Sequence, residues 1–475
     1  MIMSALIQTV AFQGIDVIDI ECQVQISNGL PAFNIVGLPD KAVAESKERI
    51  RAALHAMGLS LPAKRLTVNL APADVSKEGA HFDLPIALGL LIAMNALPSD
   101  CLEDDIVLGE LSLDGRISSV NGCLPAAIHA VAQGKNLICP ETCGQEAKWA
   151  GDLDVIAPAT LIALINHLKG TNLLPAISAQ NIADTTRDKM LVDMADVKGQ
   201  ETAKRALEIA AAGGHNILMG GPPGAGKSML AERLPTILPP LSAKEALDVS
   251  MIHSLSGALP DDGLMTTRPY RDPHHSASLP ALVGGGQKAR PGEISLAHRG
   301  VLFLDEFPEF SRATLESMRQ PLESGKTLIA RANHHISYPA KFQLVAAMNP
   351  CRCGFLGDPS MECTRAPKCG TEYQNKLSGP ILDRIDIHID VPALSVSELS
   401  TTEKGESSET ILARVKKARD IQAQRLQEKG YDSETIITNS DIPTADLDDI
   451  IQLEESAKKL LHDAADRFKL SARAY

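Results

Sequence analysis

The sequence predicts a mixed α/β protein of about three domains, and three observations lead to this fold class. The chain has 475 residues, and a domain commonly contains about 150. It is 44% hydrophobic and 22% charged, which is ordinary for a protein with well-buried cores. Short β-type runs alternate with helix-like stretches along most of the chain, which is the pattern of an α/β architecture.

Composition excludes several classes of protein. Aromatic residues make up only 3% of the chain, so base stacking on aromatic platforms is not expected. The formal charge of −13 excludes a globally basic protein that coats nucleic acid, but it does not exclude local basic loops. The longest apolar stretch, Leu84–Leu97, is too short to span a bilayer. The first residues show no basic segment or cleavage site, so we expect a cytoplasmic protein with no membrane partner.

Residues 1–168 are predicted to form the first domain. Within them, Val17–Ile20 and Leu66–Leu70 have the composition of strands, and Lys41–Met57 that of a helix. Residues 169–188 are rich in Gly, Thr, Asn, Pro and Ser, which is typical of a linker.

A second α/β domain is predicted over residues 189–393. It contains a Gly/Pro/His-rich insertion at 269–291 and a β-hairpin with a polar tip at 329–341. Residues 394–475 are charged and predicted to be helical. Apolar residues at helical spacing indicate two amphipathic helices there, one with Ile411, Val415 and Ala418 and one with Leu447, Ile450 and Ile451.

A complete P-loop lies between a strand-like run and a helix-like run. Its eight residues are Gly221, Pro222, Pro223, Gly224, Ala225, Gly226, Lys227 and Ser228. The glycines let backbone N–H groups curl round phosphates, and the helix N-terminus adds partial positive charge. Lys227 is expected to reach the β- and γ-phosphates and Ser228 to bind Mg²⁺. ATP and Mg²⁺ are therefore the predicted cofactors.

Polar residues follow two further strand-like runs. The apolar run 301–304 ends in Asp305 and Glu306, as a buried strand does when it delivers carboxylates to the open end of a parallel sheet. Asp305 is expected to hold Mg²⁺ and Glu306 to polarise the attacking water. The run 342–348 ends in Asn349, whose amide is expected to orient the water or contact the γ-phosphate.

With Val197–Gln200 and Leu382–Asp386, these motifs resemble an AAA+ ATPase of the magnesium-chelatase-like group. Three more stretches, Asn34–Asp40, Gly79–Pro85 and Asp272–His275, identify the chain as a member of the YifB/ComM family over essentially its whole length. The resemblance implies a P-loop AAA+ core with a doubly wound parallel sheet. It also implies an N-terminal Lon-protease-like domain and a C-terminal helical lid.

The resemblance further implies a bacterial homo-hexameric ATPase that drives branch migration of DNA in natural transformation, with single-stranded or branched DNA as its partner. Its catalytic residues would be Lys227, Glu306, Asn349 and Arg384, with Arg384 facing the γ-phosphate of a neighbouring subunit. A salt bridge to Asp383 or Asp386 is the alternative role of Arg384. Two other functions stay open: remodelling of a protein partner, as by the magnesium chelatase ATPase subunit, and a nucleotide-binding scaffold.

Likeness to Lon does not extend to proteolysis. The stretch Glu78–Asp83 places His81 at the position of the nucleophilic serine, and Val120–Leu124 places Leu124 at the position of the lysine. Without nucleophile or activating amine, covalent catalysis has no starting point. We therefore expect a module that forms the ring or contacts DNA, with His81 in a structural role.

Arg473 resembles the phosphate-sensing arginine of the family's sensor-2 helix. The sequence stops two residues later, so the lid is expected to be truncated or incomplete.

Four cysteines form a second candidate metal site: Cys351, Cys353, Cys363 and Cys369. Four thiolates suit structural Zn²⁺ in a loop that lacks a core of its own. Arg365 stands where the family places its fourth cysteine, and free thiols are the alternative. The pair His274 and His275 is expected to belong to a loop and not to bind metal.

DNA contact is predicted at the hairpin, through Arg331, His334 and His335 at its tip and Lys341 at its base. A chain with a net negative charge can hold DNA only through such local basic loops, repeated round a ring. Contacts to phosphates would bind DNA without recognising its base sequence. Packing of the tip against a neighbouring subunit is the alternative.

Overall fold

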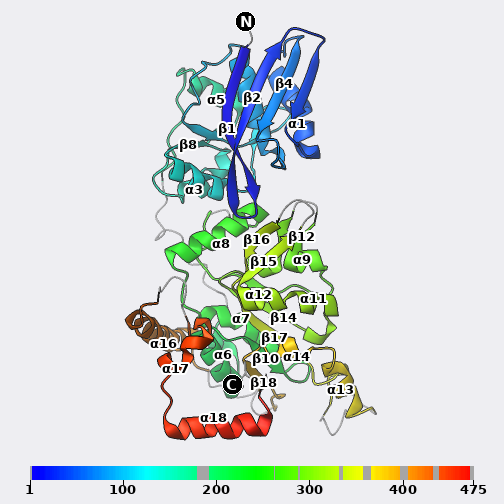
Figure 1. Cartoon of the computed structure of the whole chain (residues 1–475), viewed down its shortest axis with the longest axis vertical. Coiled ribbons are helices and arrows are strands. Elements are labelled where there is room, and N and C mark those ends of the chain that lie inside the picture. The colour runs from blue at the N-terminus through cyan, green and yellow to red at the C-terminus, as the bar shows by residue number, and fades with distance from the viewer. Residues whose placement is uncertain are drawn as a thin grey trace.

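The computed structural model describes residues 3–178, 192–260, 263–286, 289–330, 335–356, 365–395, 405–431 and 438–470. Figure 1 shows an elongated molecule in which the N-terminal strands lie at one end, a second α/β unit lies in the middle, and the last helices lie at the far end. A mixed α/β architecture was predicted and is confirmed. Among the residues described, no helix is both long and apolar enough to cross a membrane.

The N-terminal unit is built on one seven-stranded sheet in the order β3-β4-β2-β1-β5-β8-β9. β1 and β2 form a long antiparallel hairpin, whereas β5, β8 and β9 pair in parallel. The strands are β1 Met3–Gln13, β2 Asp16–Ser27, β3 Ala32–Val36, β4 Arg65–Ala71, β5 Asp105–Val107, β8 Asn136–Ile138 and β9 Val155–Ile156. A separate pair consists of β6 Glu110–Leu111 and β7 Ile117–Ser118. The strands expected near residues 17–20 and 66–70 are confirmed by β2 and β4.

Helices complete this unit: α1 Lys41–Ala56, α2 Asp83–Ala93, α3 Cys123–Gln133, α4 Gly144–Lys148 and α5 Leu161–Leu168. Every residue of α2 is buried, which explains why its sequence is apolar all round. Its first residue, Asp83, is fully buried and receives two hydrogen bonds from Arg49, of 2.6 and 2.9 Å. After α5, residues 171–178 contain no helix or strand, and the rest of the expected linker lies outside the described residues.

The second unit contains a five-stranded, fully parallel sheet in the order β11-β14-β17-β10-β18. The strands are β11 Tyr270–Arg271, β14 Val301–Leu304, β17 Gln343–Met348, β10 Ile217–Gly220 and β18 Ile387–Asp390. β10 comes first in the sequence but lies between β17 and β18 in the sheet. Because all the strands are parallel, the carboxyl ends of β10, β14 and β17 lie at one edge of the sheet, where ligands of open α/β sheets bind. All four residues of β14 are buried, as predicted for a central strand.

The described residues of this unit also form the helices α6 Glu201–Gly213, α7 Lys227–Ile237, α8 Ala243–Ser256, α9 Leu279–Val283, α10 Glu293–Leu296, α11 Arg312–Ser317, α12 Arg319–Ser324, α13 Lys368–Gln374 and α14 Gly379–Leu382. The insertion at 269–291 contains β11, α9 and the short pair β12 Gly284–Gly285 and β13 Arg290–Pro291. In the region of the expected hairpin, 329–341, β15 Lys326–Ala330 pairs antiparallel with β16 His335–Pro339, so the observed strands begin and end earlier than expected.

The C-terminal segment is helical but not as two continuous helices. α16 Ser408–Glu428 packs on α6 and α7 through its buried residues Ile411 and Val415. The second expected helix is interrupted, because a short α17 Leu447–Ile450 is followed by a break before α18 Glu455–Phe468. The apolar residues of α17 pack against Leu426 at the end of α16. The helical spacing of Leu447, Ile450 and Ile451 therefore comes from this local cluster and not from a long amphipathic helix.

The two α/β units are in contact through hydrogen bonds and through apolar packing. Gly122, before α3, donates its N–H to the carbonyl of Ser254 on α8 at 3.3 Å, and the Ser254 hydroxyl donates to the half-buried carboxylate of Glu146. Apolar packing adds a second contact, in which Ile15 of the β1–β2 turn lies against Ile336 and Tyr338 of the hairpin.

Candidate nucleotide-binding and hydrolysis site

The P-loop joins β10 to α7, as the sequence predicts. Gly221 has no room for a side chain, since a Cβ atom there would lie 2.1 Å from the carbonyl oxygen of Val391. Gly224 and Gly226 have φ angles of +76° and +93°, with no atom within 4 Å of an added Cβ. The glycines thus form an open loop whose backbone can face a phosphate group.

Lys227 lies inside this loop. Its side chain is buried, and its ammonium donates to the carbonyls of Gly221 and Pro222, at 2.7 and 2.9 Å, and to Asn349 Oδ1 at 3.1 Å. Burial lowers the pKa of Lys227, while the nearby carboxylate of Asp305 opposes that shift. The predicted lysine and the predicted asparagine are therefore brought together, although 122 positions separate them.

The two predicted Mg²⁺ ligands also meet. The Ser228 hydroxyl donates to Asp305 Oδ2 at 2.9 Å. Oxygen ligands of this kind, one hydroxyl and one carboxylate, match those that Mg²⁺ takes in P-loop proteins.

Glu306 follows Asp305 in a strained conformation. Its φ angle is +50°, a region that residues other than glycine rarely occupy. The Glu306 N–H donates to Asp305 Oδ1 at 2.8 Å, which fixes the turn. The Glu306 side chain is half exposed, so its carboxylate is available to a water molecule at the edge of the sheet. Such strain is often stored at functional positions.

His275 is a site residue that the sequence did not reveal. Its Nδ1 atom lies 3.2 Å from Glu306 Oε2, and its ring packs near His274 and Phe310. Our expectation that the histidine pair belongs to a loop is confirmed, because both follow β11 in irregular chain. The parallel pairing of β11 with β14 brings this loop to Glu306, and the only sequence signal was the polar His-His pair just after a strand.

Gln200 also forms a hydrogen bond with the P-loop. Its side-chain amide donates to the carbonyl of Ala225 at 3.2 Å and to that of Pro392 at 2.7 Å. The residue has a φ angle of +56° and precedes α6. It belongs to the Val197–Gln200 stretch that carried the family resemblance, but no role had been predicted for it.

Arg384 lies after α14 and makes an ion pair that the sequence did not suggest. It donates to Glu323 at 2.7 Å and to the carbonyl of Pro380 at 2.6 Å, so its ion-pair partner is on α12. With Arg319 of the same helix, it lines a surface depression of about 480 Å³.

The cysteine cluster lies beside the P-loop. Cys351 and Cys353 have their sulfur atoms 3.0 Å apart, and a Cβ on Gly354 would lie 2.5 Å from Pro223. Burial raises the pKa of Cys351, but a hydrogen bond with Cys353 and nearby backbone N–H groups bring it down to about 7. Cys363 lies outside the described residues. Among the residues described, no group of three or more His, Cys, Asp or Glu side chains is arranged to hold a metal ion.

Other predicted residues are placed as follows. Lys341 follows β16, and its ammonium lies 2.6 Å from Asp441. The side chains of Arg331, His334 and His335 lie outside the described part of the structure, as does Arg473. His81 is buried, bonded to the Val10 carbonyl at 2.9 Å, and burial lowers its pKa to about 4, which fits a structural role.

A parallel five-stranded sheet with a P-loop, a following Asp-Glu pair and an asparagine at one edge defines a P-loop nucleotide-binding domain of the AAA+ type. Comparison with known families agrees. The family described as magnesium chelatase, subunit ChlI, matches residues 193–399, and its C-terminal part matches 405–475. The family described as subunit ChlI of Mg-chelatase matches residues 22–143.

Individual relatives extend the match over nearly the whole chain. Competence protein ComM of Haemophilus influenzae is 42% identical over 99% of this chain and 91% of that protein. The uncharacterized protein YifB of Salmonella typhimurium is 45% identical over 89% of this chain and 82% of its own. The magnesium-chelatase 38 kDa subunit of Rhodobacter capsulatus is 28% identical over 36% of this chain and 54% of that subunit. The chain belongs to the YifB/ComM family of magnesium-chelatase-like proteins.

Proposed function

We propose that this chain hydrolyses ATP with Mg²⁺ at the P-loop site. The observation that carries this proposal is the convergence of Lys227, Asn349, Ser228 and Asp305, which are in hydrogen-bond contact at one edge of the sheet although they come from three separate elements. The open glycine loop and the oxygen ligands fit a triphosphate and its metal ion.

Each residue has a role in this proposal. Lys227 exchanges its carbonyl partners for phosphate oxygens, and Ser228 and Asp305 hold Mg²⁺, which neutralises phosphate charge. Glu306 orients and deprotonates the attacking water. Asn349 contacts the water or the γ-phosphate. Arg384 acts on the site of a neighbouring subunit in a homo-hexamer, after leaving Glu323. Arg473 remains a candidate phosphate sensor of a helical lid.

We further propose that hydrolysis drives movement on DNA, with branch migration in recombination during natural transformation as the reaction. Support comes from the 42% identity to a competence protein and from the pairing of β15 with β16, the strands that flank residues 331–334 in the sequence. The chain carries a net charge of −13, so DNA must be held by such loops. Lys341 is a weaker candidate than the tip, because Asp441 already neutralises it.

DNA-stimulated hydrolysis tests the motor. ATP hydrolysis is measured with and without single-stranded DNA and a synthetic Holliday junction, and junction migration is followed in parallel. We expect stimulation in the wild type and its loss in Arg331→Ala/His334→Ala/His335→Ala, with basal hydrolysis retained. Lys326→Ala, an exposed cation at the base of the same hairpin, is the control. A triple variant as active on junctions as the wild type would exclude the hairpin as the DNA contact.

The second candidate function is remodelling of a protein partner, favoured by the similarity to a magnesium-chelatase subunit. Hydrolysis that no DNA structure stimulates would make this the leading function. In either case the N-terminal unit, with its Lon-like resemblance and buried His81, is proposed to help form the ring or to contact DNA, without protease activity.

Structural zinc at Cys351, Cys353, Cys363 and Cys369 is also proposed, supported by the close pair of sulfur atoms. Elemental analysis of the purified protein is expected to find about one zinc per chain. Its absence, with unfolding unchanged by a chelator, would favour free thiols.

A further inference from the structure

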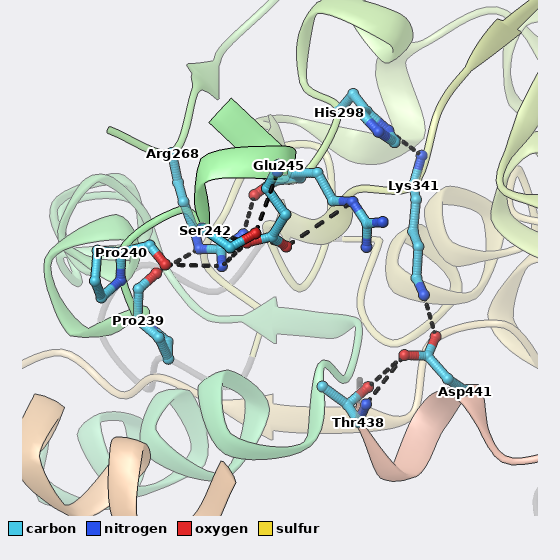
Figure 2. A network of polar contacts seen from close by, with 10 residues as sticks. Pro239, Pro240, Ser242, Glu245, Arg268, His298, Lys341, Thr438 and Asp441 are labelled. Atoms are coloured by element: carbon cyan, nitrogen blue, oxygen red, sulfur yellow. Dashed lines mark hydrogen bonds and ion pairs between the residues drawn. The ribbon is translucent and has the colours of Figure 1, made fainter. Parts of the chain in front are cut away.

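A small polar cavity lies where the AAA+ core meets the C-terminal segment. Its volume is about 80 Å³. Four cationic and two acidic side chains line it, which leaves an excess of two positive charges (4 − 2 = 2): Arg268, Arg299, Lys341, Arg419, Glu245 and Asp441. Figure 2 shows part of this cluster, with Lys341 reaching toward Asp441 and Arg268 beside Glu245. The excess charge needs a counterion.

Both carboxylates already have cationic partners. Glu245, near the start of α8, receives a hydrogen bond from Arg268 at 3.1 Å and is 12% exposed. Asp441 lies 2.6 Å from Lys341 and also accepts from the Thr438 hydroxyl at 3.2 Å. These two pairs account for two of the four cations (Figure 2).

Arg299 has no comparable partner. Its side chain is 16% exposed, and its nearest acidic contact, Glu245 Oε1, is 3.9 Å from Nε, which is beyond hydrogen-bond distance. Its Nε atom is buried and has no hydrogen-bond partner among the described residues. A largely buried cation with only this long ion pair, to a carboxylate that Arg268 also contacts, gains from a closer anion.

The backbone holds Arg299 in place. Its φ angle is +59°, in the left-handed region, and its N–H donates to the carbonyl of Lys341 at 2.6 Å. Residues kept in such strained conformations are often functional. The neighbouring Gly300 fixes the turn, because a Cβ there would lie 2.0 Å from the carbonyl oxygen of Pro269.

Burial and the positive charge shift the pKa of Arg419, which lines the cavity, and of His298, which lies next to it. Arg419 of α16 donates to the Ala211 carbonyl at 2.6 and 3.1 Å, and burial together with Arg268 lowers its pKa to about 10. Burial, with Arg299 and Lys341, lowers the pKa of His298 to about 3. His298 is therefore neutral, and its Nδ1 accepts the N–H of Lys341 at 3.0 Å.

We propose that this cavity binds one phosphate- or sulfate-sized oxyanion, held chiefly by Arg299 with Arg419 and the hydroxyl of Ser440. A volume of about 80 Å³ suits a single oxyanion and not a nucleotide, so the site is separate from the P-loop. Because Arg299 belongs to the core and Arg419 and Ser440 to the C-terminal segment, the anion ties the two together.

The test uses the full chain with Lys227→Ala, so that the P-loop does not bind the probe. Inorganic phosphate is titrated calorimetrically at constant ionic strength, with chloride as the other anion. We expect one phosphate per chain and at least a tenfold weaker affinity with Arg299→Gln, because charge-assisted hydrogen bonds are lost. Arg51→Gln, an exposed arginine of the N-terminal unit paired only at the surface, should leave phosphate binding unchanged.

Thermal unfolding separates a binding role from a structural one. In chloride, Arg299→Gln should be at least as stable as its parent, since it lowers the excess of positive charge at the cavity. In phosphate, the Lys227→Ala parent should unfold at a higher temperature than the variant that also carries Arg299→Gln. A single-stranded oligonucleotide that displaces phosphate would show that a DNA phosphate occupies the same cavity, whereas no displacement supports the free ion. No phosphate binding, or equal binding by Arg299→Gln, would overturn the proposal.

Discussion

The ring of His275 contacts the carboxylate of Glu306 at the edge of the core sheet, with 3.2 Å between Nδ1 and Oε2. Glu306 follows β14, and His275 lies in the loop after β11, the strand that pairs with β14 in parallel. The histidine can therefore hold or release the carboxylate that we propose as the catalytic base. The hydrogen bonds of Lys227 go to Gly221, Pro222 and Asn349, so the effect of His275 should fall on turnover and not on nucleotide binding.

The first prediction follows from this contact. His275→Ala should lower the rate of ATP hydrolysis by about tenfold, because the Glu306 carboxylate loses a fixed orientation. ATP affinity should stay within twofold of the wild type. Steady-state hydrolysis and equilibrium binding of a fluorescent nucleotide measure the two effects. His274→Ala is the matched control, since His274 bonds to Ser276 and not to Glu306. Equal loss in both variants would point to loop packing instead.

A second prediction separates binding from chemistry. Lys227→Ala should abolish ATP binding, because its ammonium is the cation that takes phosphate oxygens in place of the loop carbonyls. Glu306→Gln should bind ATP normally but turn it over at least a hundredfold more slowly, since the amide cannot accept a proton. Binding and single-turnover hydrolysis distinguish the two variants. Near wild-type hydrolysis by Glu306→Gln would refute the assignment.

The sequence predicted which residues meet at the P-loop edge of the sheet because each motif carries its own local geometry. A glycine-rich turn between a strand and a helix, and acids after a buried apolar run, specify positions at one edge of a parallel sheet. The contacts of Lys227 with Asn349 and of Ser228 with Asp305 confirm that these positions meet.

The contacts that the sequence did not reveal depend on tertiary packing between distant segments. His275 reaches Glu306 only because β11 pairs with β14, and Lys341 reaches Asp441 across 100 positions (441 − 341 = 100). The helix expected around Leu447, Ile450 and Ile451 was wrong in extent: α17 ends at Ile450, and these apolar residues pack in a local cluster with Leu426. Periodicity records which side chains are buried but not which partner buries them.

A third prediction concerns pH and the N-terminal sheet. Asp105 of β5 is buried, its Oδ1 has no hydrogen-bond partner among the described residues, and burial raises its pKa to about 6. The folded state therefore binds this proton more tightly than the unfolded chain. The stability that the protonated form contributes is complete below pH 4 and is lost as the pH rises through 6.

Asp105→Asn removes this dependence. Above pH 7 the variant should be more stable than the wild type, by roughly 3 kcal/mol for a shift of about two pKa units, and at pH 4 the two should be alike. Chemical unfolding monitored between pH 4 and 7.5 provides the measurement. Glu103→Gln, an exposed acid two residues away, should not change the pH profile. A profile for Asp105→Asn that parallels the wild type would assign the pH dependence elsewhere.

The last prediction places Arg384 in a neighbour's site. In one chain the arginine is tied to Glu323 and is only 11% exposed, so assembly must free it before it can meet a phosphate. Specific ATPase activity should then rise steeply with protein concentration. Arg384→Ala and Lys227→Ala should each be inactive alone, yet a mixture should recover part of the activity, because some interfaces pair an intact P-loop with an intact Arg384. Arg319→Ala, which alters the same surface depression, should remain active without mixing. Constant specific activity on dilution, together with no recovery in mixtures, would show that Arg384 serves only its own chain through the ion pair with Glu323.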